Sequence, residues 1–415
     1  NNAADGNTGN DTISETYYPA LSGVVTINSA MPTGGTNFNS FNDLQNALNQ
    51  GGLGGPLTVN VAAGTYNEQF SLGEITGSSA TNTVTIDGAG AATLSHDKSI
   101  RNSTLTLEGT SYITISNMTI AATGGLDSWG IHVWDGAHHV TIDNNTVTTP
   151  IGTTGDVVGI MVSGSETSDN TTADVNDITI SNNTVTGGER GISVYGNFTA
   201  SSRSQNLIIH NNDIQNADDN GLYVAGYNNV TITDNYVDGL TNAFSDGMYS
   251  SDLENFTITG NRFKGGDNGW EGQDSNFDNA PTGRSTIANN MFIGGDDGLY
   301  LDDCEEIDIF HNTTSAADYG IFLNDDVNLD IRNNIFTSNG GDYAFYSTDN
   351  SATMTLDYNV YYTSGANLAY YSTGYTDLAA FQAGQITLNT NSLAGDPLFN
   401  NPTADLHVSG NIAND

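Results

Sequence analysis

The chain has 415 residues, with 8 Lys and Arg against 48 Asp and Glu, and a formal net charge of −40. Such an excess of negative charge repels nucleic acid and anionic membranes, and no apolar run of about 18 residues is present, so we expect neither nucleic acid binding nor membrane insertion. Because 36% of the residues are hydrophobic and 9% are aromatic, the chain can build a core, and we interpret the charge as surface charge.

The chain opens on a polar stretch, residues 1–22, which we interpret as a linker exposed by processing. Residues 39–49 then predict a helix that two glycines end, with four apolar residues on one face: Phe41, Leu44, Ala47 and Leu48. We expect this short helix to cap the N-terminal end of residues 23–110, which also hold the first coils of a repeating structure.

From about residue 113 one phrase recurs: an apolar residue, two spacers, Asn, one spacer and an apolar residue, as in VTIDNNTV. Met118 fills the Asn slot of the first copy, and the others carry Asn145, Asn183, Asn212, Asn235, Asn261, Asn290, Asn312, Asn334 and Asn359. The shortest intervals, such as that from Asn290 to Asn312, each correspond to one minimal coil. Because the strands are rich in Ile, Val and Thr and lack a leucine-rich frame, they predict an all-β fold, a right-handed parallel β-helix of about 22–29 residues per coil, regular over residues 111–362.

A second phrase recurs half a coil later, in which Gly precedes alternating apolar residues, as in Gly130-IHVW and Gly298-LYLD. In four coils the interval from this Gly to the Ile of the Asn phrase is the same, as from Gly298 to Ile309, which indicates stacked coils. Alternation of period two sends Ile131 and Val133 into the core. We expect the Gly and Asn of the turns to accept left-handed backbone geometry and the Asn side chains to hydrogen-bond up one column.

The C-terminal residues 363–415 predict a second cap, with a short helix in YTDLAAFQAG and closing strands in DPLF and ADLHV. These repeats resemble the pectin-lyase-like superfamily of right-handed β-helices. The opening GVVTINSAMPTGGTNFNSFNDLQNAL and the closing DPLFNNPTADLHV are similar to β-helix modules of large secreted surface proteins of Bacteroidetes. The resemblance implies the fold and a secreted or cell-surface location, but no single activity, since the superfamily holds lyases, hydrolases, esterases, adhesins and phage tailspikes.

The second residue after each Gly is expected to face outward, which gives a column of His132, Met161, Ser193, Tyr223, Tyr249, Glu271, Tyr300, Phe322 and Tyr346. Exposed rings one strand spacing apart suit contact with sugar rings or with a protein partner. The alternative is that the rings stack across coils and stabilise the sheet. Our candidate ligand contacts are Tyr223, Tyr249, Trp270, Tyr300, Phe322, Tyr346 and Arg284.

An acidic column stands immediately before the Gly, formed by Asp219, Asp246, Asp267, Asp296, Asp297, Asp318 and Asp342. Like charges stacked one strand apart repel, so a counterion such as Ca²⁺ would relieve them. The candidate Ca²⁺ ligands are Asp219, Asp267, Asp296, Asp318 and Asp342. The alternative is that these carboxylates cap turn N–H groups and are otherwise solvated.

Two kinds of polysaccharide chemistry occur on folds of this type. A lyase acting on uronates needs basic groups to bind its anionic substrate. The three candidates, Arg262, Lys264 and Arg284, are few for this purpose in so acidic a chain. A glycoside hydrolase needs only two carboxylates at a suitable separation, for which the candidates are Glu271, Asp302, Asp297 and Asp246. The stretch GGDDGLYLDDC partly resembles polygalacturonases, but their downstream His-Gly and Arg-x-Lys elements have no counterpart in this sequence.

One coil departs from the repeat. The interval from Gly269 to Ile287 is longer than the interval shared by the four regular coils, which predicts a loop within QDSNFDNAPTGR beside the carboxylate of Glu271. Taken together, the sequence favours a secreted or cell-surface protein of structural or adhesive type whose aromatic and acidic face contacts a glycan or a matrix protein partner. The alternative is a polysaccharide-active enzyme, a hydrolase in preference to a lyase.

Overall fold

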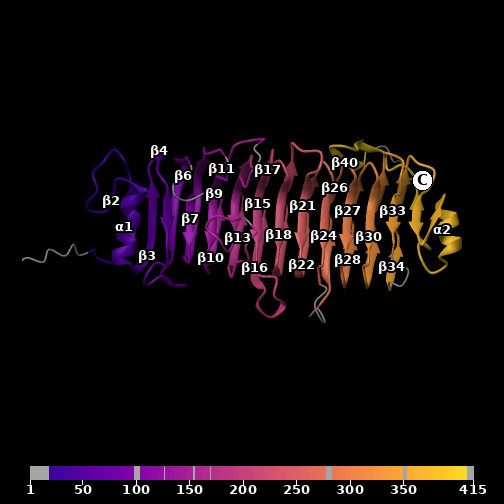
Figure 1. Cartoon of the computed structure of the whole chain (residues 1–415), viewed down its shortest axis with the longest axis horizontal. Coiled ribbons are helices and arrows are strands. Elements are labelled where there is room, and N and C mark those ends of the chain that lie inside the picture. The colour runs from indigo at the N-terminus through magenta and orange to yellow at the C-terminus, as the bar shows by residue number, and fades with distance from the viewer. Residues whose placement is uncertain are drawn as a thin grey trace, which may run out of the picture.

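The computed structural model describes residues 18–97, 103–125, 127–152, 155–168, 170–276, 283–348 and 353–408. Short strands wind around one long axis, coil beside coil, from a cap at the N-terminal end to a cap at the C-terminal end (Figure 1). Neighbouring coils pair in parallel throughout this stack. The predicted parallel β-helix is therefore confirmed. No helix among these residues is long and apolar enough to cross a membrane.

Each regular coil has three faces, and the first two belong to one sheet of 25 strands. The long-strand face consists of β1 (Leu21–Ile27), β3 (Leu53–Val61), β6 (Val84–His96), β8 (Ser111–Ala122), β10 (His138–Asp143), β13 (Asn176–Ser181), β16 (Ser204–His210), β19 (Tyr227–Thr233), β22 (Glu254–Thr259), β25 (Ser285–Ala288), β28 (Ile307–Phe310), β31 (Leu329–Arg332) and β34 (Met354–Asp357). The short-strand face consists of β2 (Asn37–Phe38), β4 (Gly64–Asn67), β11 (Thr146–Thr148), β14 (Thr184–Thr186), β17 (Asp213–Gln215), β20 (Tyr236–Asp238), β23 (Arg262–Lys264), β26 (Met291–Ile293), β29 (Thr313–Ser315), β32 (Ile335–Ser338), β35 (Val360–Thr363) and β38 (Leu393–Ala394).

The third face is a separate sheet of 13 strands. It consists of β5 (Phe70–Leu72), β7 (Ser103–Glu108), β9 (Trp129–Trp134), β12 (Val158–Val162), β15 (Arg190–Tyr195), β18 (Asn220–Ala225), β21 (Asp246–Ser251), β24 (Trp270–Gln273), β27 (Asp297–Asp302), β30 (Tyr319–Asn324), β33 (Phe345–Ser347), β36 (Ala369–Tyr371) and the antiparallel β37 (Thr373–Tyr375). Alternate residues of all three faces point into one apolar core. The aligned Ile residues of the long-strand face, for example, are fully buried: Ile142, Ile180, Ile209, Ile232, Ile258, Ile287, Ile309 and Ile331.

The predicted Asn column forms the corner between the long-strand and short-strand faces. At each level the Asn amide reaches both the preceding coil and the following coil. Asn261, which is 1% exposed, donates through Nδ2 to the carbonyl of Ile232 at 2.8 Å and to Oδ1 of Asn290 at 3.0 Å. The backbone N–H of Asn261 also donates to that same Oδ1, at 2.9 Å. The same pattern runs from Asn145 to Asn359, so the column is confirmed.

The backbone geometry of the recurring turns differs from our expectation in one respect. The left-handed residue is the one immediately before each column Asn, as at Asn144 with φ 53° and Asn289 with φ 56°. The recurring Gly of the third face is needed for close approach instead. A Cβ on Gly221 would lie 2.1 Å from Cγ1 of Val237 and 2.9 Å from the carbonyl oxygen of Gly247. The absence of a side chain at Gly221 therefore lets these coils pack closely at this edge.

A short helix lies at each end of the stack, but the strands expected in DPLF and ADLHV do not close the last coils. The helix α1 (Phe41–Gly51) begins at Ser40, whose hydroxyl accepts from the N–H of Asp43 at 3.0 Å, and its four predicted apolar residues are buried. The helix α2 (Leu378–Gly384) begins at Asp377 and covers the opposite end. A 3₁₀ turn, η1 (Ala200–Ser202), lies between. The stacked strands start at Leu21, just inside the expected linker, and residues 1–17 of that linker lie outside the described residues.

The C-terminal segment folds back along the helix. Its hairpin, β39 (Phe399–Asn401) and β40 (Asp405–Val408), lies against the short-strand face near β29 (Figure 1). Two side chains of that face hold its backbone: Ser315 Oγ donates to the carbonyl of Pro402 at 2.6 Å, and Arg262 Nη2 donates to the carbonyl of Ala404 at 2.9 Å. The segment thus spans several coils.

Removal of one column amide tests how much the corner depends on it. We expect Asn261→Ala to lower the free energy of unfolding by roughly 3 kcal/mol, because it leaves buried donors and acceptors of two coils unpaired. Asn49→Ala, on the exposed side of α1, should change it by less than about 0.5 kcal/mol. Urea unfolding followed by circular dichroism measures both, and equal midpoints would contradict the role of the column.

Candidate functional site

The outer surface of the 13-stranded sheet carries the predicted outward column. Backbone register aligns Tyr223 with Tyr249, Tyr249 with Glu271 and Glu271 with Tyr300, and it continues through Phe322 to Tyr346. The order expected from the Gly phrase is therefore found. The column is not exposed along its whole length.

The first three members, His132, Met161 and Ser193, were expected outside but are at most 1% exposed. Met161 packs with Trp129 and Val158 in a small apolar cluster separate from the main core. The loop ahead of β12 reaches over this cluster, since Nε1 of Trp129 donates to the carbonyl of Asp156 at 2.6 Å. Loops thus close the surface over the first coils and leave it partly open from Tyr223 onward.

The half-buried rings stack on one another. Tyr223 and Tyr249 have centroids 5.1 Å apart and planes 12° from parallel, and Phe322 and Tyr346 have centroids 5.0 Å apart at 26°. Tyr300 also contacts Phe322, at 4.8 Å. Because the ring faces cover each other, most of the column offers ring edges and hydroxyls to solvent. Cross-coil stacking, the alternative named for these residues, is present in the structure.

Two other residues expected among the ligand contacts lie elsewhere. Trp270 is 1% exposed in the core, where it packs on Phe292 and donates from Nε1 to Ser250 Oγ at 3.0 Å, so it cannot touch an outside ligand. Arg284 lies beside the long-strand face, where it pairs with Glu306 at 2.7 Å and Asp308 at 2.5 Å. It therefore does not join the carboxylates of the third face. Residues 277–282 of the predicted insertion loop lie outside the described residues.

Glu271 interrupts the aromatic column between Tyr249 and Tyr300. Two amides hold its carboxylate: Gln273 Nε2 donates to Oε1 at 2.6 Å and Asn268 Nδ2 donates to Oε2 at 3.2 Å. Asn268 Nδ2 also donates to Oδ1 of Asp246, at 3.0 Å. One amide nitrogen therefore contacts an oxygen of each carboxylate, and the lengths of these two hydrogen bonds limit how far apart the oxygens can be. Asp246 and Glu271 thus form a carboxyl pair bridged by Asn268.

Burial changes the acidity of this pair. Asp246 is 8% exposed, and burial with the nearby charge of Glu271 raises its pKa to about 7. Hydrogen bonds from the side chain and backbone of Asn268 oppose that rise, and Asn220 Nδ2 also donates to Asp246 Oδ2, at 3.2 Å. Burial also raises the pKa of Glu271, with smaller contributions from the carboxylates of Asp267 and Asp302. A pair of acids in which one member holds a proton near neutral pH is the arrangement used in general acid catalysis.

The expected acidic column is in fact two neighbouring columns. Backbone hydrogen bonds of 2.8 Å connect Asp267 with Ser245, Asp296 with Asp267, and Asp318 with Asp296, so Ser245 stands where Asp246 was expected. Asp246 and Asp297 belong to the adjacent column, in which Asp246 pairs with Asn220 and Asp297 with Tyr319. Asp219 has its own partner in Arg190, at 3.8 Å.

Protonation relieves the repulsion between several of these acids. Burial and a hydrogen bond shared with Asp296 raise the pKa of Asp267 to about 6. Burial and three neighbouring carboxylates, the strongest in effect being Asp296, raise the pKa of Asp297 to about 7. The pKa of Asp318 is raised too, by burial and by the charges of Asp296 and Asp342. One shared proton removes a like-charge pair without a counterion.

Within the described ranges, no three His, Cys, Asp or Glu side chains are grouped so that they could hold a metal ion. Ca²⁺ binding by Asp219, Asp267, Asp296, Asp318 and Asp342 stays a prediction. Melting temperatures in millimolar Ca²⁺ and in chelator would test it. Asp302, the last acidic candidate, aligns with Gln273 and accepts from Asn324 Nδ2 at 2.6 Å.

The amides that organise the pair were not predicted from the sequence. Asn220 and Asn268 each stand one residue before the recurring Gly, in the same position as Asp246. That position alternates Asn, Asp, Asn and Asp from Asn220 to Asp297, and this alternation is the signal that could have revealed them. An amide beside each carboxylate supplies donors that a column of acids alone lacks.

A family model described as "Right handed beta helix region" matches residues 64–237, 103–280 and 200–361, which together cover well over half of the chain. No curated protein matches the sequence. Among solved structures, the A-module of a mannuronan C-5 epimerase from Azotobacter vinelandii aligns over 86% of this chain and 93% of its own, with 13% identity and a TM-score of 0.54.

Two further solved structures align with this chain. A lacto-N-biosidase from Eubacterium ramulus aligns over 90% of this chain and 66% of its own, with 11% identity and a TM-score of 0.51. A surface adhesin of Streptococcus pneumoniae aligns over 73% of this chain and 89% of its own, with 17% identity and a TM-score of 0.42. At such identities the likeness is one of fold.

The raised pKa values predict an unusual dependence of stability on pH. With a folded-state pKa of about 7, Asp297 keeps a proton that the unfolded chain loses at about pH 4. The free energy of unfolding should therefore fall as the pH rises from about 4 to 7 and stay low above that. Asp297→Asn removes the carboxyl group whose ionisation causes this loss of stability. The amide oxygen of the new side chain can still accept from the N–H of Tyr319. At pH 8 we expect the variant to be more stable than the parent by roughly 2 kcal/mol.

Urea unfolding at pH 4 and pH 8 measures this difference. Asp325→Asn is the control, because it changes an exposed carboxylate and should shift the free energy of unfolding equally at the two pH values. If Asp297→Asn and its parent differ by the same amount at both pH values, the carboxyl of Asp297 does not hold a proton in the folded state.

Proposed function

This chain belongs to the right-handed β-helix family, and from that premise we propose that it acts on a polysaccharide as a carboxylate-dependent glycoside hydrolase. The observation that carries the proposal is the Asp246–Glu271 pair bridged by Asn268. A pKa of about 7 for Asp246 supplies a proton donor at neutral pH, and Glu271 is partly exposed beside it. The chemistry of glycoside hydrolysis needs just such an acid and a second carboxylate.

The spacing of the pair favours retention of the anomeric configuration. Retaining glycosidases have carboxyl groups about 5–5.5 Å apart, whereas inverting enzymes leave room for a water, at about 6.5–9.5 Å. The hydrogen bonds from Asn268 Nδ2, at 3.0 and 3.2 Å, hold one oxygen of each carboxylate close to the other, which favours the shorter separation. Glu271 would then act as the nucleophile, because it stands on the outward column, and Asp246 as the acid.

The reaction would proceed in two steps. Glu271 attacks the anomeric carbon while Asp246 gives its proton to the leaving glycosidic oxygen, so the bond to the leaving sugar breaks and a glycosyl ester forms. Water then attacks the same carbon, Asp246 takes a proton from that water, and the Glu271 carboxylate leaves. Gln273 and Asn268 hold Glu271 through its two oxygens, which orients it for attack.

The comparisons favour this enzyme over the structural or adhesive protein that the sequence first suggested. The epimerase and the biosidase, both with TM-scores above 0.5, are named for reactions on carbohydrate. A lyase is less well supported. Among the described residues Arg262 and Lys264 both pair with Asp238, at 3.0 and 3.3 Å, and Arg284 pairs with Glu306, so each of these cations is already held in an ion pair. We also propose an extracellular or cell-surface location, where polysaccharides are found.

Substitution of the pair tests the assignment. On a substrate found by screening plant and marine polysaccharides, we expect Glu271→Gln and Asp246→Asn each to lower kcat by about 10³-fold, because each removes an essential group. Asp302→Asn, one coil away, should change kcat by less than about ten-fold. Reducing ends measure turnover, and absorbance of 4,5-unsaturated products would reveal a lyase. If Asp302→Asn is as damaging as Glu271→Gln, the wrong pair has been assigned.

The pH profile gives a separate test. Because the acid must hold a proton, kcat/KM should fall about ten-fold per pH unit above about pH 7, the pKa of Asp246. Proton NMR of the first product formed should show the anomeric configuration of the substrate. Inversion would exclude the two-step mechanism, and glycan binding without any turnover would leave the adhesive protein as the better description.

A further inference from the structure

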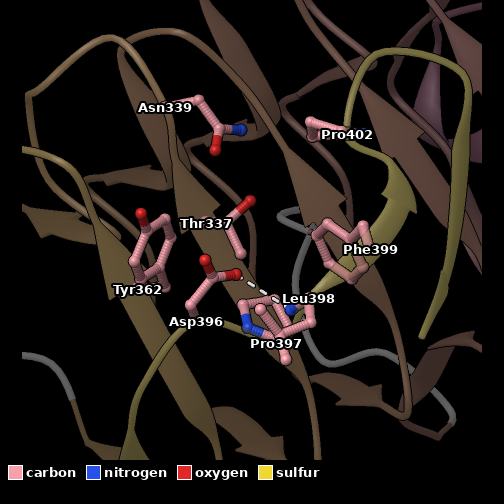
Figure 2. A pocket seen from close by; sticks show the side chains of 8 residues that line it. All are labelled: Thr337, Asn339, Tyr362, Asp396, Pro397, Leu398, Phe399 and Pro402. Carbon is pink, nitrogen blue, oxygen red and sulfur yellow. Dashed lines mark hydrogen bonds between the residues drawn. The ribbon is translucent and has the colours of Figure 1, made fainter. Parts of the chain in front are cut away.

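A second candidate site lies away from the carboxylate pair, where the C-terminal segment folds over the short-strand face. Here a cavity of about 330 Å³ opens between the end of β32, the strand β35 and residues 396–402 (Figure 2). The proposed hydrolysis uses none of its residues. Its volume is at the lower end of the range for small-molecule sites, about 300–1,000 Å³, and suits a single sugar ring.

Two aromatic rings bound this cavity. In Figure 2, Tyr362 from β35 and Phe399 from the C-terminal hairpin flank it on opposite sides, with Pro397 and Pro402 beside the latter. The C-terminal wall is held in place, since the carbonyl of Pro402 accepts from Ser315 Oγ at 2.6 Å. A cavity whose walls are already fixed costs little ordering when a ligand enters. Aromatic faces of this kind pack on the C–H faces of sugar rings.

The polar groups around the cavity leave hydrogen-bonding capacity unused. Asp396 accepts from the N–H of Leu398 at 2.8 Å through Oδ1, and Oδ2 has no hydrogen-bond partner among the described residues. Asn339 donates from Nδ2 to Ser315 Oγ at 2.8 Å, which leaves its Oδ1 as an acceptor. In Figure 2 that oxygen is directed toward Thr337, on the inner side of the cavity. The hydroxyl of Tyr362 likewise has no partner in the part of the chain that is described.

These free groups define the ligand by its chemistry. Asp396 Oδ2 and Asn339 Oδ1 are acceptors, so the ligand must bring donors, as neighbouring sugar hydroxyls do. A uronate is disfavoured because its carboxylate would meet Asp396 in a chain of net charge −40. A metal ion is disfavoured because the cavity offers a single carboxylate.

We propose that this cavity binds one uncharged sugar ring of a glycan, with neighbouring hydroxyls on Asp396 and Asn339 and a ring face against Tyr362. The site binds without cleaving and lies on a different face from the carboxylate pair. It would hold the polymer on the helix whether or not the third face is catalytic.

Isothermal titration tests this with neutral probes, cellohexaose, xylohexaose and mannohexaose, and with an anionic probe, the galacturonate hexamer. All titrations use Glu271→Gln as the background, so that turnover does not consume a probe. We expect at least one neutral probe to bind at millimolar or lower concentration and the galacturonate to bind at least ten-fold more weakly. Tyr362→Ala should lower the affinity for the neutral probe at least ten-fold, and Asp396→Asn should lower it several-fold.

Phe244→Ala is the matched control, since it removes a ring that is 78% exposed outside the cavity. It should leave the affinity unchanged. In the parent with an intact Glu271, Tyr362→Ala should not alter kcat on a short substrate. The proposal is overturned if no neutral probe binds, if Phe244→Ala weakens binding as much as Tyr362→Ala, or if the galacturonate binds best. The cavity and the proposed hydrolase can fail independently. A variant that loses binding of the neutral probe but keeps normal turnover, or one that keeps binding but loses turnover, shows that the two sites are separate.

Discussion

The whole structure depends on satisfying backbone polar groups at a buried corner. Where each coil turns from the long-strand to the short-strand face, the chain bends inside the protein and cannot use water to pair its N–H and carbonyl groups. The column Asn meets this need by bonding to the coil on either side, as Asn261 does with Ile232 and Asn290. These hydrogen bonds form in only one register between neighbouring coils. They therefore also align the other columns of side chains along the helix. The carboxylate pair and the tyrosine stack are consequences of this alignment.

Much of the fold could be predicted from spacing alone. The repeated Asn and Gly phrases identify the coils, their pairing and the inward residues, and the caps show ordinary helix signals around Ser40 and Asp377. The family assignment depends on the same regularity. The exposure of individual residues was harder to predict, because it is decided by loops of irregular length. His132 and Met161 have the outward register, yet a loop near Asp156 buries their neighbourhood.

The candidate site was only partly predictable for a related reason. Glu271 and Asp246 could be recognised as acids on adjacent coils, but the shift that places Ser245 beside Asp267 is invisible without the backbone register. Asn268 and Gln273 matter because of where their amides point, which composition does not specify. Burial then converts a common residue type into a proton donor, as with Asp246. The cavity beside Tyr362 needed three-dimensional information altogether, since its walls come from segments that are distant in the sequence.

The return of the C-terminal segment changes how the molecule resists being pulled apart. A solenoid whose coils contact only their neighbours can unfold coil by coil from one end. Here the segment that follows the last coils is tied to Ser315 on β29 and to Arg262 on β23, which lies still nearer the N-terminus. The C-terminal segment therefore connects coils that are not neighbours in the stack. Opening of the outermost coils must therefore also break contacts with coils deeper in the stack.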